Sequence, residues 1–132
     1  MLYDAFLNRR AVNLQPETAM KLPEQAELVR IFIGEGDKYE GHPLYRAIVN
    51  LARERGLAGA TVTRGLMGFG AHSRMHYAGI LRLSEDLPII IEIVDRPDRI
   101  EAFLPELDSM IVEGLVTVEK VRVLKYLPGE KR

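Results

Sequence analysis

The chain has 132 residues, of which 47% are hydrophobic and 28% charged, and its formal net charge at pH 7 is -1. This composition is typical of one globular domain, and the balanced charge argues against a dedicated nucleic-acid binder, which carries a basic excess. The absence of cysteine excludes a disulfide framework, a thiolate metal site and a cysteine nucleophile.

No stretch of the sequence predicts insertion into a membrane. The longest apolar run, Leu87 to Val94, contains Pro88 and Glu92 and is too short to span a bilayer. The N-terminus lacks the basic region, apolar stretch and cleavage site of a signal peptide. We therefore expect a cytoplasmic protein with no direct membrane insertion.

Residues 1–23 are the least informative part, because Pro16 and Pro23 prevent a long helix there. We interpret this segment as an N-terminal extension, with an arm that packs on a neighbouring subunit as the alternative. The first strand is expected at Ala26 to Gly34, where apolar residues on both faces indicate a central strand.

A polar loop from Glu35 to His42 follows the first strand. Pro43 is then placed as the first residue of a helix that runs to about Arg55, because its missing N–H costs nothing at that position. Gly56 is expected to end this helix in the left-handed conformation.

The most distinctive stretch runs from Gly59 to Ser73. It begins as a strand, and then Gly65, Gly68 and Gly70 remove side chains where the strand should end. Glycine permits a positive φ there and lets a ligand approach the backbone. Cationic or titratable side chains lie close by in the sequence, a combination that suits an anion such as a nucleotide phosphate: Arg64, His72, Arg74 and His76. The alternative is a bulged strand end that needs glycine for its geometry alone.

The second half predicts a strand, a helix and a strand. A strand is expected at Leu87 to Val94 and a helix from Asp95 to Gly114, which Pro105 kinks or splits. The last strand, Leu115 to Tyr126, changes the parity of its valines, which predicts a bulge near Glu119 and Lys120. Residues 78–86 are ambiguous between a hairpin arm and a turn, and residues 128–132 form a C-terminal tail.

The order strand, helix, strand, strand, helix, strand indicates the α+β class and a ferredoxin-like split βαβ (βαββαβ) fold in residues 24–127. In this fold a four-stranded antiparallel sheet has two helices on one face. Because the other face would expose apolar residues of the first and third strands, we expect a homo-oligomer formed through that face.

Several short motifs occur in the order found in a known family. They are Gly34-Glu35 with Asp37, Gly41 with Pro43-Leu44-Tyr45, Gly59-Ala60-Thr61-Val62, Arg64-Gly65, Gly68-Phe69-Gly70 and Ser73. Over about residues 26 to 126 the chain resembles the family catalogued as domain of unknown function 190. That family is similar in turn to the PII signalling proteins, which are ferredoxin-like homotrimers that bind adenine nucleotides in clefts between subunits.

The resemblance implies a site and a partner. It places the backbone of Gly68, Phe69 and Gly70 against the nucleotide and implies a mobile loop at about residues 72–84. In PII proteins this loop touches membrane transport proteins, so a transporter or channel is the implied partner. The nucleotide-binding residues expected on this basis are Arg64, Gly68, Phe69, Gly70, His72, Arg74, Lys120 and Arg122.

The sequence departs from the PII pattern between the second helix and the last strand. PII proteins have a glycine-rich loop with lysine there, whereas Val112 to Leu115 contains one glycine and no lysine. Only Lys120, Arg122 and Lys125 of the last strand could then serve the phosphates, which favours AMP or ADP over a triphosphate.

Two other functions stay open. A metal-responsive trimer of the same fold would use His72, His76 and the Glu35 to Glu40 loop, although no acidic partner stands at a fixed spacing. A small enzyme would use the cleft between subunits, but no nucleophile, base and orienting group can be recognised. We therefore expect no enzymatic activity, no catalytic residue, no bound metal and no cofactor beyond the nucleotide ligand.

Overall fold

The structure of the protein is a computed structural model that describes residues 24–70, 76–77 and 86–129. The predicted N-terminal extension, His72, Arg74 and most of the 72–84 loop lie outside these ranges.

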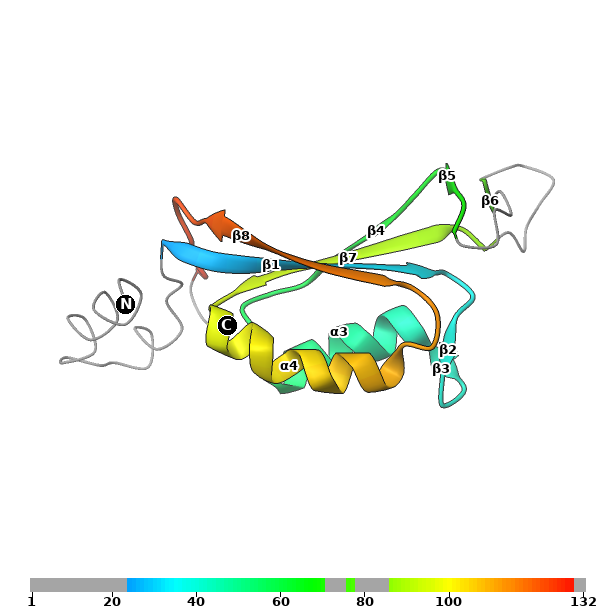
Figure 1. Ribbon diagram of the computed structural model, residues 1–132, viewed down its shortest axis with the longest axis horizontal. Coiled ribbons are helices and arrows are strands. Elements are labelled where there is room, and N and C mark those ends of the chain that lie inside the picture. Colours follow the sequence, from blue (N-terminus) through cyan, green and yellow to red (C-terminus); the bar gives the residue numbers. More distant parts are fainter. Residues whose placement is uncertain (1–23, 71–75, 78–85, 130–132) are drawn as a thin grey trace.

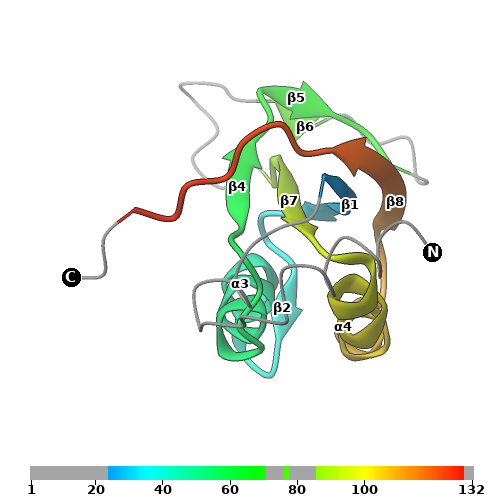
Figure 2. The same ribbon diagram turned by 90° about the vertical axis from the view of Figure 1, so that its left-hand side faces the viewer.

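A four-stranded antiparallel sheet has both helices on one side (Figure 1). Its strands, in spatial order, are β4 (Thr61–Arg64), β7 (Pro88–Asp95), β1 (Gln25–Gly34) and β8 (Leu115–Arg122). The helices are α3 (Leu44–Glu54) and α4 (Pro97–Met110). Seen end-on, the sheet forms one layer and the helices the other (Figure 2). The predicted α+β ferredoxin-like fold is confirmed.

The two central strands are the ones whose sequences are apolar on both faces. β1 pairs with β7 over eight consecutive residue pairs, from Glu27 opposite Asp95 to Gly34 opposite Pro88. Their odd-numbered apolar residues face the helices and are buried, whereas their even-numbered apolar residues on the other face, apart from the buried Ala26, are half-buried. The period of two that predicted these strands therefore gives one fully covered face and one uncovered face.

The core lies between the sheet and the helices. Its buried members come from β1, β7 and both helices: Val29, Ile31, Ile33, Leu44, Ile48, Ala52, Ile89, Ile91, Ile93, Ile100, Phe103, Leu107 and Met110. Helical spacing brings the α3 and α4 members onto one stripe each, so both helices bury one side and expose the other.

The ends of the helices follow their sequence signals with small shifts. Pro43 is the N-cap of α3 rather than its first residue, and Gly56 takes a φ of 70° beyond the C-cap as predicted. α4 begins with Pro97 and continues through Pro105 without a break. The predicted split is wrong, because Pro105 lies on the exposed side, where water can satisfy the carbonyl that loses its partner.

A short hairpin connects β1 to α3 where the sequence predicted only a polar loop. It pairs β2 (Lys38–Tyr39) with β3 (His42–Pro43). Its two turn residues, Glu40 and Gly41, have φ values of 49° and 81°. Positive φ at both positions is the geometry of a tight type I′ hairpin turn, which glycine accommodates easily.

The predicted bulge in β8 is absent. Eight consecutive residues of β8 pair with β1 in one register, including Glu119 opposite Leu28 and Lys120 opposite Glu27. The valines change parity because the covered face changes along the strand. Val116 packs against the core, whereas Val121 lies opposite Ala26 on the other face, where Ala26 is 1% exposed. The strand also ends at Arg122 rather than Tyr126.

The segment after β8 crosses from the β8 edge of the sheet to its β4 edge (Figure 2). The Val123 N–H donates to the Glu24 carbonyl at 2.6 Å, and the Tyr126 hydroxyl donates to the Ala58 carbonyl at 3.1 Å. Ala58 is held in turn by Asp95, a fully buried carboxylate that accepts its N–H at 2.8 Å. Asp95, at the end of β7, therefore holds the turn before β4, and Ala58 in that turn holds the C-terminal segment.

Candidate functional site

The glycine-rich segment begins where β4 ends. The Gly65 N–H donates to the Pro88 carbonyl at 2.7 Å, and a Cβ at Gly65 would lie only 2.8 Å from Pro88 Cγ. A Cβ at Gly68 would lie 3.2 Å from the same atom. Gly65, Gly68 and Gly70 all lack a positive φ. The sequence-based expectation that glycine permits a positive φ here therefore does not explain them. Close packing on the Pro88 ring explains the first two glycines.

Gly70 has no such packing partner among the described residues. In the described part of the structure, nothing lies within 4 Å of a Cβ built at Gly70. An alanine at this position would therefore meet none of the described residues. A glycine in such a place leaves room for the close approach of a ligand.

Apolar side chains surround these glycines and face solvent. Leu66 is 80% exposed, Met67 58% and Phe69 66%. β5 (Met67–Gly68) pairs with β6 (His76–Tyr77), and this pair projects above the uncovered face of the sheet (Figure 1). Exposed apolar groups gathered on a projecting arm are typical of a contact surface.

Arg64 lies beside this segment and forms an ion pair with Glu35, an acid that the sequence analysis did not assign to the nucleotide site. Arg64 Nη1 is 2.9 Å from Glu35 Oε2. The loop that carries Glu35 is itself fixed, because the Glu35 N–H donates to the Leu87 carbonyl and the Gly34 N–H donates to Asp37 Oδ2. Glu35 belongs to the Gly34-Glu35 motif, which was the only sequence signal that could have found it.

Lys120 and Arg122 lie at the other end of the sheet and on its other edge. Arg64 pairs with Ile89, which lies opposite Ile33, whereas Lys120 lies opposite Glu27. At roughly 3.3 Å per residue, the two positions are about 20 Å apart along β1, and the two edge strands are about 14 Å apart. One phosphate group cannot contact both sets within a protomer.

The cations at the far end are exposed. Lys120 is exposed, and Arg122 Nε forms an ion pair of 2.9 Å with Glu24 Oε1 on the protein surface. The structure therefore places Arg64 and the segment Gly68-Phe69-Gly70, which follows it in the chain, at one end of the sheet, and Lys120 and Arg122 at the other.

Among the residues that the structure describes, no group of three or more histidine or acidic side chains is arranged to hold a metal. His76 lies opposite Gly68 in the β5–β6 pair, and His72 is outside the described ranges. Across the same described ranges, no helix is both long and apolar enough to cross a membrane.

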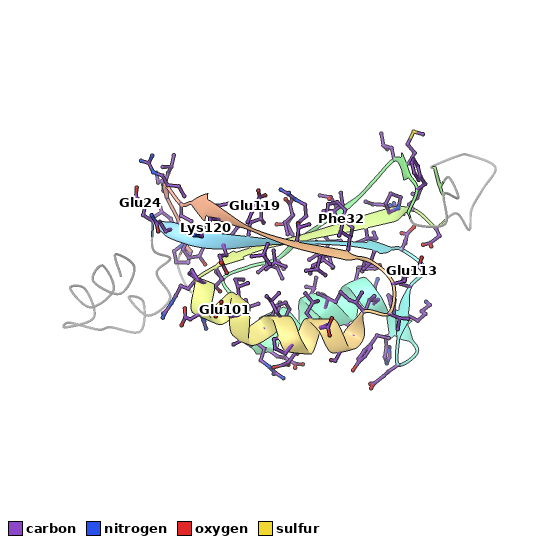
Figure 3. The ribbon with its side chains drawn as sticks, in the orientation of Figure 1. Glu24, Phe32, Glu101, Glu113, Glu119 and Lys120 are labelled. Atoms are coloured by element: carbon purple, nitrogen blue, oxygen red, sulfur yellow. The ribbon has the colours of Figure 1, made fainter. Side chains whose placement is uncertain are left out.

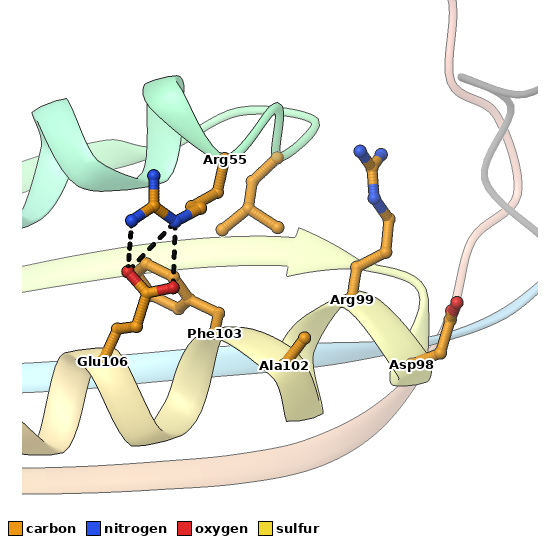
Figure 4. Close-up of a pocket in the computed structure, with 7 residues that line it drawn as sticks. Arg55, Asp98, Arg99, Ala102, Phe103 and Glu106 are labelled. Carbon is orange, nitrogen blue, oxygen red and sulfur yellow. Dashed lines mark hydrogen bonds and ion pairs between the residues drawn. The ribbon is translucent and has the colours of Figure 1, made fainter.

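A shallow cavity of about 240 Å³ lies between the end of α3 and the first half of α4 (Figure 4). An ion pair closes it on one side, with Arg55 Nη2 2.7 Å from Glu106 Oε2 and Arg55 Nε also donating to this carboxylate. The hydrogen bond from Arg55 lowers the pKa of Glu106, and the same bond raises the pKa of Arg55. This pocket contains none of the residues predicted to bind the nucleotide.

A model of the DUF190 family, described as "Uncharacterized ACR", matches residues 26–123. The chain belongs to the DUF190 family. A UPF0166 protein of Aquifex aeolicus (strain VF5) is 38% identical to it over 98 residues, which cover 74% of this chain and 92% of the relative. A UPF0166 protein of Methanocaldococcus jannaschii is 37% identical over 102 residues, which cover 76% of this chain and 94% of the relative.

Solved structures share the fold of this DUF190 protein at low sequence identity. CPII from Thiomonas intermedia K12, bound to ADP and bicarbonate, has a TM-score of 0.52 at 24% identity, over 80% of this chain and 94% of that one. A putative PII-like signalling protein of Thermus thermophilus has a TM-score of 0.55 at 20% identity, over 75% of this chain and 89% of that one. The divalent cation tolerance protein CutA1 of the same organism has a TM-score of 0.50 at 12% identity, over 77% of this chain and 87% of that one.

Proposed function

We propose that this DUF190 protein is a PII-like regulatory oligomer, a homotrimer, that binds an adenine nucleotide between its subunits. Residues 24–127 form the nucleotide-binding domain. The segment Gly68-Phe69-Gly70 of one subunit lies against the nucleotide, and Arg64, His72 and Arg74 of that subunit contact its phosphates. Lys120 and Arg122 reach the same phosphates from the neighbouring subunit.

The observation that carries this proposal is the position of the two sets of candidate residues on opposite edges and opposite ends of one sheet. A contact in which the Arg64 end of the β4 edge of one copy meets the Lys120 end of the β8 edge of the next brings the two sets together, and it can repeat around a closed ring. The fold shared with CPII, a protein whose structure contains ADP, supports an adenine nucleotide as the ligand.

AMP or ADP fits the charge of this site better than ATP. Arg64 is partly neutralised by Glu35, and the far cations are Lys120 and Arg122, the latter also paired with an acid. Few cations therefore remain for a triphosphate.

Nucleotide binding is coupled to a partner through the 72–84 loop. The β5–β6 pair joins Gly68, in the segment proposed to contact the nucleotide, to His76, which belongs to this loop. A nucleotide that contacts Gly68 to Gly70 changes the free energy of the loop, and by linkage the partner changes nucleotide affinity by the same factor. We propose that the partner is a membrane transport protein, that the protein acts in the cytoplasm and that it is not an enzyme.

Isothermal titration calorimetry with AMP, ADP and ATP tests the proposal. We expect binding of AMP or ADP by the wild type and a loss of about ten- to a hundredfold in affinity for Arg64→Ala and for Lys120→Ala, because each removes a charged contact to phosphate. Arg53→Ala, an exposed arginine on α3, is the matched control and keeps the wild-type affinity. Unchanged affinity in Arg64→Ala and Lys120→Ala would overturn the placement of the phosphates.

The structural similarity to CutA1 favours one other function, a response to divalent cations. In that case a divalent metal raises the melting temperature in the absence of nucleotide, and His76→Ala abolishes the shift. A nucleotide-dependent shift that survives chelation of all metals would exclude this alternative.

A further inference from the structure

A short loop of residues 34–37 follows β1 and contacts two parts of the chain that lie far from it in the sequence. Glu35 Oε2 of this loop is 2.9 Å from Arg64 Nη1, so the loop pairs with the cation that we propose binds the phosphate. The Gly36 N–H of the same loop donates to Asp86 Oδ1. The 34–37 loop therefore connects the proposed phosphate ligand to Asp86, a residue to which the proposed function gives no role.

Asp86 explains both glycines of the 34–37 loop. A Cβ at Gly34 would lie 2.7 Å from Asp86 Oδ2 and 2.9 Å from Asp86 Oδ1, and a Cβ at Gly36 would lie 3.2 Å from Asp86 Oδ1. Neither glycine has a positive φ, so the space that the carboxylate fills requires them, rather than their backbone conformation. The Gly34-Glu35 motif of the sequence combines a seat for Asp86 with the acid that faces Arg64.

Backbone groups fix the rest of the 34–37 loop. The Glu35 N–H donates to the Leu87 carbonyl at 2.8 Å, and the Asp37 carbonyl accepts the Leu44 N–H at 2.8 Å. Because these bonds hold the loop on both sides of its third residue, the remaining freedom of the loop lies at that residue, which the Asp86 side chain holds. The Asp86 side chain therefore decides how firmly the Glu35 side chain is kept in its ion pair.

The 34–37 loop lies at the end of the sheet where Figure 3 shows Glu113, whereas Lys120 lies toward the other end. The register agrees, since β1 runs into the loop at Gly34, whereas Lys120 pairs near the first residue of β1. Within one protomer the loop can therefore act on the Arg64 half of the proposed site and not on the Lys120 half.

We propose that Asp86 is a positioning residue that, through the 34–37 loop, keeps Glu35 paired with Arg64 and so lowers the affinity of the site for phosphate. This inference rests on the proposed function and adds a regulator of the same site. A phosphate that binds Arg64 displaces Glu35 and removes one of the interactions that fix the loop. By linkage, a tighter hold of Asp86 on the loop weakens phosphate binding, and phosphate binding weakens that hold by the same factor.

The position of Asp86 in the chain makes this hold a means of regulation. Asp86 follows the 72–84 loop, which we propose contacts the partner, and precedes β7. A partner that draws Asp86 away from the 34–37 loop frees Glu35 from Arg64 and raises the affinity for nucleotide. The partner therefore has a route to the phosphates besides the Gly68-Phe69-Gly70 segment.

Hydrogen exchange of residues 34–37, measured by mass spectrometry on the nucleotide-free full chain, tests the connection. EDTA is present, so that no divalent cation bridges the carboxylates. Arg64→Ala frees Glu35, and we expect exchange in the loop to become about two- to fivefold faster. Asp86→Ala has the same effect, whereas Asp86→Asn keeps an oxygen that accepts the Gly36 N–H and stays close to the wild type. Arg53→Ala, on the exposed end of α3, is the control and leaves exchange unchanged.

Calorimetry with ADP separates positioning from a purely structural role. We expect Asp86→Ala to bind ADP several-fold more tightly than the wild type, by no more than Glu35→Gln does, and Asp86→Asn to bind as the wild type. In a Glu35→Gln background, Asp86→Ala gives no further gain, because both changes act on the same ion pair. Equal gains in Asp86→Asn and Asp86→Ala would mean that the charge of Asp86 acts directly on the ligand, and this would overturn the proposal.

The outcomes distinguish this proposal from the proposed function. Unchanged exchange in Arg64→Ala would overturn the connection between Arg64 and Asp86, whether or not the protein binds a nucleotide. Wild-type affinity for ADP in Asp86→Ala would overturn the positioning role and leave the nucleotide site standing. Faster exchange in Arg64→Ala, in a protein that binds no adenine nucleotide, would overturn the proposed function and support the connection.

Discussion

Arg64 and Glu35 form an ion pair, with the guanidinium Nη1 2.9 Å from the carboxylate Oε2, at the point where β4 meets the glycine-rich segment. The Arg64 side chain is 60% exposed and that of Glu35 30% exposed. An exposed pair of this kind contributes about 0 to 1 kcal/mol to stability. Its main consequence is electrostatic, because Glu35 partly neutralises the cation that we propose binds the phosphate.

We expect Glu35→Gln to strengthen the binding of AMP or ADP by several-fold. The amide neither repels the phosphate nor competes strongly for Arg64, whereas the carboxylate does both. Calorimetry on the wild type and the variant measures the change, and Glu54→Gln on the exposed end of α3 is the control. A loss of affinity in Glu35→Gln would mean that the carboxylate orients Arg64 for the ligand rather than competing with it.

Two glycine-to-alanine changes should separate packing from binding. In Gly65→Ala the new Cβ would lie 2.8 Å from Pro88 Cγ, so we expect a loss of about 1–3 kcal/mol in the free energy of unfolding. Gly70→Ala meets nothing in the described protomer, so we expect unchanged stability and weaker nucleotide binding. Urea unfolding and calorimetry give the two readouts. If the Gly70→Ala variant bound the nucleotide with wild-type affinity, a contact between Gly70 and the nucleotide would be contradicted, and the glycine would serve backbone geometry alone.

The two central strands and both helices were predictable because their signals are local and strong. The isoleucines of β1 and β7 alternate with a period of two, and α3 and α4 have clear apolar stripes. The same alternation, applied to β8, produced the wrong bulge. The position of an apolar residue in a strand shows only which face of the sheet is covered at that point. Val116 points to the face that the helices cover, whereas Val121 points to the other face.

The site was predictable only in part. The sequence located Arg64 and the glycines, but it could not show that Gly65 packs on Pro88, because that contact joins residues distant in the chain. It also could not show that Lys120 lies on the opposite edge from Arg64, which depends on the order of the strands. Asp95 gave no signal beyond a helix start, yet it is the one buried charged residue in the described core.

Asp95 should be important for stability rather than for binding. It is fully buried and accepts the N–H groups of Ala58 at 2.8 Å and Arg96 at 2.7 Å. Asp95→Ala leaves both donors without this acceptor, so we expect a loss of about 2–4 kcal/mol in the free energy of unfolding. Asp108→Ala, on the exposed side of α4, should change it by less than about 0.5 kcal/mol. Chemical denaturation compares them, and equal effects would contradict this assignment.

Glu106 should titrate below the ordinary range of glutamate. Its pKa is lowered by the hydrogen bond from Arg55, so the carboxylate contributes stability at neutral pH, and this contribution is lost as the pH falls through the lowered pKa. NMR titration of the side-chain carboxyl should show a low midpoint that returns toward about 4.3 in Arg55→Gln. In Arg53→Gln, an exposed neighbour on α3, the midpoint should stay low. An unchanged midpoint in Arg55→Gln would rule out this cause.

The division of the site between two copies is tested most directly by mixing two defective subunits. Arg64→Ala and Lys120→Ala chains, carrying different tags, are coexpressed, and the mixed oligomers are purified through both tags. If each nucleotide contacts Arg64 of one copy and Lys120 of the next, a mixed trimer has both native residues at about a third of its interfaces. We expect calorimetry to recover that fraction of sites at wild-type affinity for ADP. Mixed oligomers that bind no better than either parent would contradict a site shared between subunits.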